Sequence, residues 1–185
     1  KTDITDKGLD DKLDEIRDNI DIILHMAAFL SSGNDILDWS HNINVNIIGT
    51  HKLLKWAARK KVGAFYFISS YIHLNPKFQP FSLSSDFMPA SPYALSKLAN
   101  ELEIIDICKS NKIRYAIFRL PSIYGPHHVR HWTVLPCMIR SAFLNKIIAV
   151  FGEGSRTMNF VHSNDVYSAI SKAAEKDATG IFHVG

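Results

Sequence analysis

The amino-acid sequence predicts an α/β fold, in which a doubly wound parallel sheet is built from strands that alternate with helices. Short apolar runs of strand length recur along the chain, and longer segments with an apolar face at helical spacing lie between them. This alternation is typical of βαβ units, whose right-handed crossovers give parallel strands. The 185 residues, 46% of them hydrophobic, are enough for one domain with a buried core.

The first part of the chain supplies two strands and one helix. Residues 21–28 form an apolar run that ends in small residues, as buried parallel strands do. Residues 46–59 carry apolar side chains at helical spacing and are predicted to form a helix. A second buried strand over residues 64–68 places Ser69 and Ser70 at its carboxyl end.

A long loop over residues 71–90, interrupted by prolines, leads into the next helix. That helix is predicted over residues 92–109, because Pro92 suits the first helical turn. A third strand is predicted over residues 114–119 and stops before Pro121.

Two more helices and two more strands are predicted for the last part of the chain. Residues 133–144 are expected to form a helix and residues 146–151 a strand. Asp165 is predicted to cap a final helix that runs to about residue 176, because aspartate is a preferred N-cap. A strand over residues 181–184 closes the chain.

Small and polar residues fall at the carboxyl ends of these predicted strands. Ligands of open parallel sheets bind at this edge, so the residues there are candidates for a binding site. They are Ala27, Ala28, Ser69, Ser70, Leu120 and Ser122.

Tyr93 and Lys97 are the pair whose spacing says most about chemistry. Residues four apart on a helix lie on one face, so both side chains can reach the same small volume. A phenol titrates near pH ~10 and is a poor base at neutral pH, but a lysine cation beside it lowers its pKa. A phenol with such a neighbour has the chemistry needed to take a proton from a hydroxyl group while hydride leaves the carbon that bears it.

Composition narrows the function classes. The net charge of +3 is too small and too scattered for nucleic-acid binding, and no apolar run of about 18 residues occurs, so neither nucleic acid nor a membrane is expected as a partner. Cys108 and Cys137 are interpreted as buried, reduced thiols of a cytoplasmic protein. His127, His128 and His131 lack a partner carboxylate, so a substrate-facing loop is favoured over a metal site and no metal is predicted.

Several short stretches occur in one order along the chain. They are D-I-T-D at residues 3–6, L-H-M-A-A at 24–28, N-I-I-G-T at 46–50, S-P-Y-A-L-S-K at 91–97, R-L-P-S-I-Y-G-P at 119–126, F-G-E-G at 151–154 and F-V-H-S-N-D-V at 160–166. Together they resemble the NAD-dependent sugar-nucleotide epimerase/dehydratase family of the extended short-chain dehydrogenase/reductase superfamily. The resemblance implies a Rossmann-like sheet with part of a small substrate-binding region.

The resemblance also implies a catalytic role for three residues. Tyr93 is expected to be the general base or acid on the sugar hydroxyl. Lys97 is expected to hold the nicotinamide ribose and to lower the pKa of Tyr93. Ser70 is expected to hydrogen-bond the same sugar hydroxyl, with Ser69 as the alternative hydroxyl for this role.

Further residues are implied in cofactor and substrate binding. Those implied for NAD are Asp3 and Ile4 at the adenine, Ala27, Ala28, Asn46, Ser69, Tyr93, Lys97 and Leu120. Ser122 and Arg156 are implied for the nucleotide sugar. Arg156 stands two residues before Met158, where the family has a diphosphate-binding arginine, and in a strand it would face the same side.

The chain contains no G-x-x-G-x-x-G stretch, with which the family holds the cofactor's pyrophosphate. It is therefore expected to correspond to part of a family member. Residues 1–125 are expected to form a partial NAD-binding domain, residues 126–160 a partial substrate-binding region, and residues 161–185 a helix and strand that return to the sheet. NAD is the expected cofactor, with NADP as the alternative, because the residue that separates them belongs to the missing stretch.

The positions after the serine pair separate activities within the family. Dehydratases and related decarboxylases carry acids there, whereas this chain has Tyr71 and Ile72. An epimerase acting through a transient ketosugar is therefore expected. A net NAD(P)-dependent dehydrogenase or reductase is one alternative, and a cofactor-binding regulator without turnover is another. The resemblance also implies a homodimer through the helices over residues 46–59 and 93–109.

Overall fold

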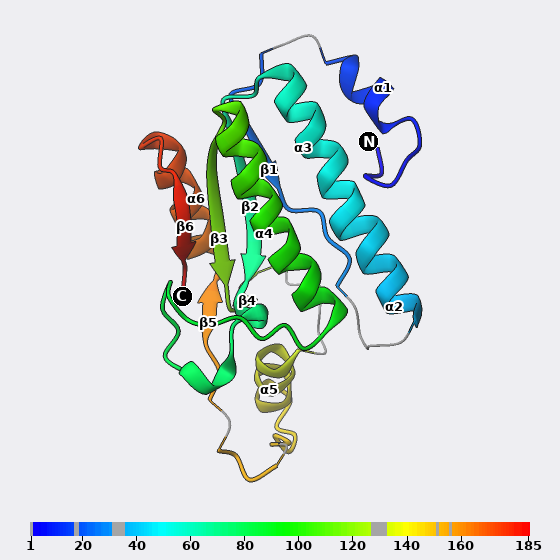
Figure 1. Ribbon diagram of the computed structural model, residues 1–185. Coiled ribbons are helices and arrows are strands. Elements are labelled where there is room, and N and C mark those ends of the chain that lie inside the picture. The colour runs from blue at the N-terminus through cyan, green and yellow to red at the C-terminus, as the bar shows by residue number, and fades with distance from the viewer. Residues whose placement is uncertain (1, 17–18, 31–35, 127–132, 151, 156) are drawn as a thin grey trace.

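A four-stranded parallel sheet forms the centre of the molecule (Figure 1). The computed structural model describes residues 2–16, 19–30, 36–126, 133–150, 152–155 and 157–185. In spatial order, the strands of the sheet are β1 (Ile22–His25), β2 (Ala64–Ser70), β3 (Arg114–Leu120) and β6 (Gly180–His183). All three neighbouring pairs are parallel, which confirms the predicted α/β fold.

Helices cover both faces of this sheet. α3 (Gly49–Lys60) and α4 (Pro92–Asn111) lie on one face, and α6 (Ser163–Glu175) lies on the other (Figure 1). The sheet is therefore doubly wound, as the sequence predicts. α1 (Leu9–Asp14), which the sequence did not predict, packs beside α3.

The alternation of β2 explains why both faces are covered. Successive side chains of a strand point to opposite faces. Phe65 and Phe67 are buried in the cluster that includes α3 and α4, whereas Tyr66 is buried in the cluster that includes α6. The Tyr66 hydroxyl also donates a hydrogen bond to the carbonyl of Ala173 in α6, at 2.9 Å. A strand that is apolar on both sides needs a partner layer on each.

The helix predicted over residues 46–59 begins earlier than expected. α2 (Ile36–His41) leads into the π-helical segment η1 (Asn42–Ile48), and α3 follows without a break. Asparagine and β-branched residues are weak helix formers, so the sequence of η1 does not indicate a helix. Its buried asparagines are instead held by tertiary contacts, and short π-helical segments are frequent at functional sites.

The helix predicted over residues 92–109 is confirmed, and it extends to Asn111. The Ser91 hydroxyl caps it by accepting a hydrogen bond from the Ala94 amide at 3.1 Å, and Pro92 occupies the first turn. Lys112 ends the helix in the left-handed conformation. The cap fixes where the helix begins, and therefore where Tyr93 points.

The strand predicted over residues 146–151 is wrong. Residues 146–150 have no regular secondary structure, and Ile147 and Val150 are exposed. A short apolar run does not by itself distinguish a strand from other structure. The second sheet is formed instead by two three-residue strands, β4 (Ser122–Tyr124) and β5 (Phe160–His162), which pair in parallel. Strands this short leave no periodic signal in the sequence.

Asp165 is not the cap of the last helix. The His162 ring accepts the hydrogen bond from the Asn164 amide at 3.2 Å, so α6 begins at Ser163 and Asp165 lies in its first turn. A carboxylate there still interacts favourably with the helix dipole. α5 (Val134–Phe143) agrees with the predicted helix over residues 133–144.

Two other expectations concern the burial of the cysteines and membrane-spanning helices. Cys108 is buried as expected, but Cys137 is exposed, because none of the side chains of α5 is fully buried. Among the described residues, no helix is both long and apolar enough to cross a membrane.

Candidate active site at the carboxyl ends of the strands

Lys97 lies between the start of α4 and the end of β2. Its side chain is buried, and its ammonium donates a hydrogen bond to the carbonyl of Ile68 at 2.7 Å. The same nitrogen is 4.5 Å from the ring centroid of Phe67 and 5.7 Å from that of Tyr93. The predicted pairing of Tyr93 with Lys97 on one helical face is therefore present.

Burial controls the charge of this lysine. Desolvation lowers the pKa of Lys97 to about 8, and the carboxylate of Glu101 acts in the opposite direction. Below that pH the side chain is an ammonium beside the Tyr93 ring. A cation at this place favours the phenolate form of Tyr93, which is the form that can accept a proton.

The two serines at the end of β2 have different surroundings. Ser69 is buried, and its hydroxyl donates to Glu101 Oε1 at 2.5 Å. Ser70 is half-buried, and its hydroxyl oxygen accepts a hydrogen bond from the Ile72 amide at 3.3 Å. An oxygen that accepts from an amide can still donate its own hydrogen to a ligand. The structure therefore favours Ser70 over Ser69 as the hydroxyl that meets a substrate.

The short helix η2 (Tyr71–His73) follows directly after Ser70. Tyr71 packs against the rings of Phe81 and His183, with centroid distances of 5.6 and 4.9 Å. Ile72 is half-exposed. The two positions where family dehydratases carry acids therefore hold an aromatic packing residue and an aliphatic side chain.

Asn46 supports the segment that follows β1. Its side-chain amide donates to the carbonyl of Phe29 at 2.9 Å, and its oxygen accepts from the Phe29 amide at 2.7 Å. The same nitrogen reaches Asn42 and the hydroxyl of Ser96 in α4. Asn46 thus ties η1, α4 and the residues after Ala28 together.

A second set of buried polar residues adjoins Asn46. No motif in the sequence indicated that these residues would contact one another. Asn100 donates to the carbonyl of Asn46 at 3.0 Å and to the hydroxyl of Thr50 at 3.2 Å. That hydroxyl is 2.8 Å from Nε2 of His25. Burial lowers the pKa of His25 to about 4, with a smaller contribution from Lys97. His25 is therefore a neutral hydrogen-bonding residue at the end of β1.

An apolar cavity opens beside the end of β1. Its volume is about 350 Å³, and its lining consists of Thr2, Ile4, Leu9, Leu13, Leu24, His25, Met26, Ala27 and Leu53. A Cβ atom on Gly49 would lie 3.0 Å from the side chain of Ile4, so this glycine allows the N-terminal segment to approach the start of α3 closely. Asp3 is exposed, and hydrogen bonds from Thr5 lower the pKa of its carboxyl group.

The remaining predicted site residues are dispersed around this edge. Ala28 is exposed beyond β1, Leu120 is buried at the end of β3, and Ser122 is exposed at the start of β4. Arg156 and the histidines at 127, 128 and 131 lie outside the described residues. Within the described part of the chain, no group of three His, Cys, Asp or Glu side chains is arranged to hold a metal ion.

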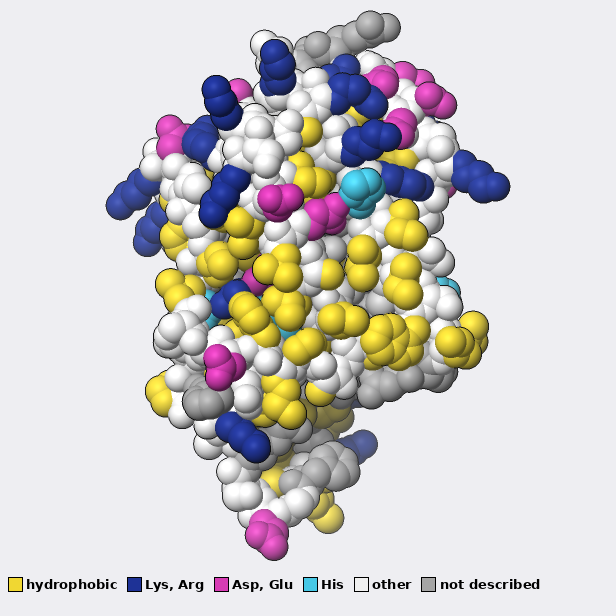
Figure 2. Space-filling view, viewed as in Figure 1, with side chains coloured by type: hydrophobic (Ala, Val, Ile, Leu, Met, Phe, Trp, Pro, Cys, Tyr) yellow, Lys and Arg dark blue, Asp and Glu magenta, His cyan; other side chains and the backbone are white. Residues whose placement is uncertain are grey.

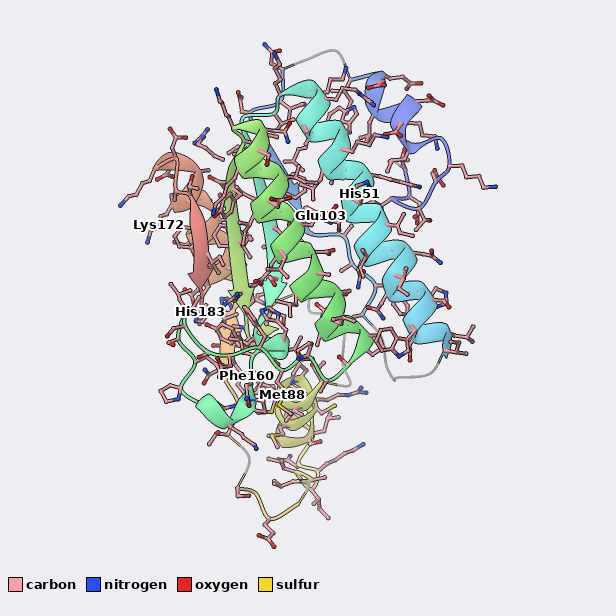
Figure 3. The ribbon with its side chains drawn as sticks, viewed as in Figure 1. His51, Met88, Glu103, Phe160, Lys172 and His183 are labelled. Carbon is pink, nitrogen blue, oxygen red and sulfur yellow. The ribbon has the colours of Figure 1, made fainter. Side chains whose placement is uncertain are left out.

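Sequence reasoning missed a buried ionic cluster beneath the serines. Glu101 and Arg119 are both buried, and the Arg119 Nη2 atom donates to Glu101 Oε2 at 2.7 Å. His183, at the end of β6, lies 3.4 Å from Arg119 Nη1 (Figure 3). The available signal was the spacing of Tyr93, Lys97 and Glu101, which puts all three on one face of α4.

Known protein families include one whose model matches this chain. The family model for the NAD dependent epimerase/dehydratase family matches residues 1–185. The chain belongs to this family. The resemblance to the extended short-chain dehydrogenase/reductase superfamily is thereby confirmed.

Relatives and solved structures include both activities of the family. A putative UDP-glucose 4-epimerase of Methanocaldococcus jannaschii is 29% identical over 90% of this chain and 55% of its own length. A human dTDP-D-glucose 4,6-dehydratase is 30% identical over 91% of this chain and 48% of its own length. The chain thus spans about half the length of these relatives.

The solved structure of UDP-glucuronic acid 4-epimerase from Bacillus cereus, in complex with UDP-glucuronic acid and NAD, has a similar fold. It superposes with a TM-score of 0.84 at 26% identity, covering 100% of this chain and 58% of the other. The UDP-N-acetylglucosamine 4-epimerase of Methanobrevibacter ruminantium M1 superposes with a TM-score of 0.85, also at 26% identity, covering 100% of this chain and 60% of the other.

Proposed function

We propose that the protein is an NAD-dependent epimerase of a nucleotide-activated sugar, with Tyr93 as its acid/base. The observation that carries this proposal is the buried ammonium of Lys97 beside the Tyr93 ring, at the strand end that presents Ser70. A buried cation next to a phenol can supply the general base for an alcohol-to-ketone step. Family membership supports the same chemistry.

The residues present fit a dinucleotide cofactor. The apolar cavity at the end of β1 is of a size that holds a flat ring system, and the exposed Asp3 lies in the segment that borders it. Ala27 and Ala28 have short side chains, so the backbone there can come close to a ligand. NAD, when bound, supplies the hydride acceptor and donor. The NAD complex of the Bacillus cereus epimerase supports this choice, and NADP is the alternative.

The protein's own residues handle the proton. Tyr93, as the phenolate, would take the hydroxyl proton of the sugar, and after the ketosugar has rotated Tyr93, as the phenol, would return a proton to the ketone oxygen. Ser70 would donate a hydrogen bond to the same sugar oxygen and hold it near Tyr93. The Lys97 ammonium would stabilise the phenolate, so its charge matters in both half-reactions.

An epimerase is favoured over a dehydratase by η2. Elimination of water from a sugar needs an acid near the catalytic hydroxyl, and Tyr71 and Ile72 supply no carboxylate there. A net dehydrogenase or reductase would use the same Tyr93 chemistry but would exchange its cofactor with the medium. A regulator without turnover would not need the buried Lys97 charge.

The test is an assay of the full-length protein with UDP- and dTDP-hexoses and their uronic acids in the presence of NAD. Interconversion of two epimers without accumulation of NADH is the expected result. Stoichiometric NADH release would establish the dehydrogenase instead. NAD binding without conversion of any of these sugars would favour the regulator.

We also propose that the protein forms a homodimer through α3 and α4. Exposed apolar side chains gather on this side of the molecule, as Figure 2 shows. They include Ile43 and Ile48 of η1, which continues into α3, and Leu95 and Leu102 of α4. This set is called the α3/α4 apolar face below. His51 and Glu103, which interact at 2.5 Å across the two helices, border it (Figure 3). An apolar face of this kind on a charged helix pair is typical of protein–protein contact.

A further inference from the structure

The carboxylate of Glu101 joins four elements of the fold beneath the proposed site. It accepts hydrogen bonds from the Ser69 hydroxyl at the end of β2, at 2.5 Å, and from Nη2 of Arg119 at the end of β3, at 2.7 Å. Nε of Arg119 is 3.1 Å from each of its oxygens. Nε2 of His73 in η2 is 3.3 Å from Oε1. Glu101 itself is in α4, the helix of Tyr93 and Lys97.

The cluster is closed off from water. Glu101, Arg119 and His73 are each at most 1% exposed. Burying a charge in this way is costly unless the charge is paired and hydrogen-bonded, and here the carboxylate has both kinds of partner. Phe87 packs against this cluster, with its ring 5.7 Å from that of His73 and 5.4 Å from the Arg119 guanidinium.

Two of these contacts lead directly to proposed catalytic groups. Ser69 precedes Ser70, so the hydrogen bond from Ser69 to Glu101 fixes the end of β2 against α4. Lys97 is one helical turn before Glu101 on the same face, which brings its ammonium into the field of the carboxylate. Removing Glu101 would therefore affect both the serine end of β2 and the lysine.

We propose that Glu101 is a positioning residue of the proposed epimerase site, which holds the Ser70 end of β2 in place and keeps the Lys97 ammonium charged during catalysis. This role rests on the proposed function of Tyr93, Lys97 and Ser70. Its chemical basis is simple: a fixed negative charge in a site of low dielectric favours a nearby cation.

The other charged and titratable groups around the two residues do not take over this role. They are Tyr93 in α4, His25 in β1, His73 in η2, Arg119 in β3 and His183 in β6. Burial lowers the pKa of His25 and His73 to about 4, so both are neutral near pH 7. Arg119 is a cation and opposes the charge on Lys97. Glu101 therefore supplies the negative charge that the lysine needs.

The test is a direct titration of Lys97 in the full-length protein. Isotope-labelled lysine gives an NMR signal whose shift reports protonation, and Lys97→Met identifies the signal by its loss. In Glu101→Gln the Lys97 pKa is expected to fall by roughly one unit or more, with a matching shift of the alkaline limb of kcat to lower pH. Asp106→Asn, which removes an exposed carboxylate from the same helix, is the control and should leave both unchanged.

A purely structural role for Glu101 would lower the melting temperature without moving the Lys97 titration, and that result would overturn the proposal. An equal shift in Asp106→Asn would also overturn it. Should Glu101→Gln fail to fold because Arg119 is left unpaired, the double variant Glu101→Gln with Arg119→Gln removes both buried charges and is compared with Arg119→Gln alone. Equal Lys97 pKa values in these two variants decide against the proposal. The NMR titration needs no turnover. A protein that epimerises with an unshifted Lys97 therefore refutes only the role of Glu101, whereas a protein without epimerase activity refutes the proposed function.

Discussion

At the scale of single residues, the site depends on one lysine that remains charged although it is buried. The Lys97 ammonium donates a hydrogen bond to the carbonyl of Ile68 and faces two aromatic rings, so little water can stabilise it. Its position beside Tyr93 was predictable, since residues four positions apart on a helix lie on the same face. The contribution of Glu101 was not, because it requires knowing that the ends of β2 and β3 lie against α4.

The residue whose loss should be most specific is Tyr93. Tyr93→Phe removes one oxygen and keeps the ring, so folding and NAD affinity should be close to those of wild type. General acid/base catalysis is worth about 10²–10⁴-fold, and kcat of the full-length epimerase should fall by that factor. Steady-state kinetics and the melting temperature check this. Retention of more than about a third of the wild-type turnover would show that another group moves the proton.

Lys97 should also affect stability in a pH-dependent manner. The native pKa of about 8 is lower than that of a free lysine, so between about pH 8 and about pH 10 the unfolded chain binds more protons than the folded one. Stability from this group therefore rises with pH in that window, by up to about 3 kcal/mol. Wild type should gain stability relative to Lys97→Met as the pH is raised, as urea unfolding at several pH values would reveal. Lys55→Met, which replaces an exposed lysine, is the control, and parallel pH profiles for all three proteins would contradict the expected shift.

Tyr71 and Ile72 lead to a prediction about reaction type. The full-length protein should form no 4-keto-6-deoxy sugar from a nucleotide hexose, because neither position holds a carboxylic acid and burial raises the pKa of the Tyr71 phenol, which makes it a weak proton donor. Product analysis by mass spectrometry, with a family dehydratase as the positive control, checks this. Loss of one water from the hexose would mean that an acid from elsewhere in the protein reaches the sugar.

At the scale of elements, most helices and strands were predictable from their own sequence. The exceptions depend on contacts with distant parts of the chain. The strands β1, β2, β3 and β6 and the helix α4 carry strong apolar patterns or caps, so their local sequence is sufficient. The segment η1 is helical because its asparagines bond to distant parts of the chain, and β4 and β5 exist because they pair with each other. Residues 147–150 are apolar, but they pair with no strand in the part of the chain that the structure describes.

Asn46 offers a test of an element held by such contacts. Asn46→Ala removes the hydrogen bonds to both backbone groups of Phe29 and leaves buried groups unsatisfied, which should cost about 1–3 kcal/mol of stability. The segment with Ala27 and Ala28 should loosen, so NAD affinity should fall as well. Asn44→Ala, an exposed position in the same segment, is the matched control. Calorimetric titration with NAD measures the effect, and equal affinities in the two variants would exclude this supporting role.

At the scale of the whole molecule, the strand order brings distant stretches of sequence to one edge. β2 and β3 are neighbours in the sheet, so Ser70 and Leu120 are register partners although 50 positions separate them. α4 begins at the same end, and β6 returns beside β3 to bring His183 to Arg119. The sequence predicts that such an edge exists, since alternating strands and helices imply it. Which buried ions meet there depends on the register of all four strands.

The α3/α4 apolar face gives the last prediction, because a dimer would bury it. Leu102, the most exposed leucine of α4, should lie near the centre of the proposed contact. Leu102→Glu would place a like charge on each protomer in a desolvated interface, which should weaken association by several kcal/mol and give monomers at micromolar concentration. Leu83→Glu is the control, since Leu83 is similarly exposed but lies in the loop between β2 and α4. Analytical ultracentrifugation of the full-length proteins distinguishes the outcomes: dimeric wild type and Leu83→Glu with monomeric Leu102→Glu support the interface, and a dimeric Leu102→Glu excludes it.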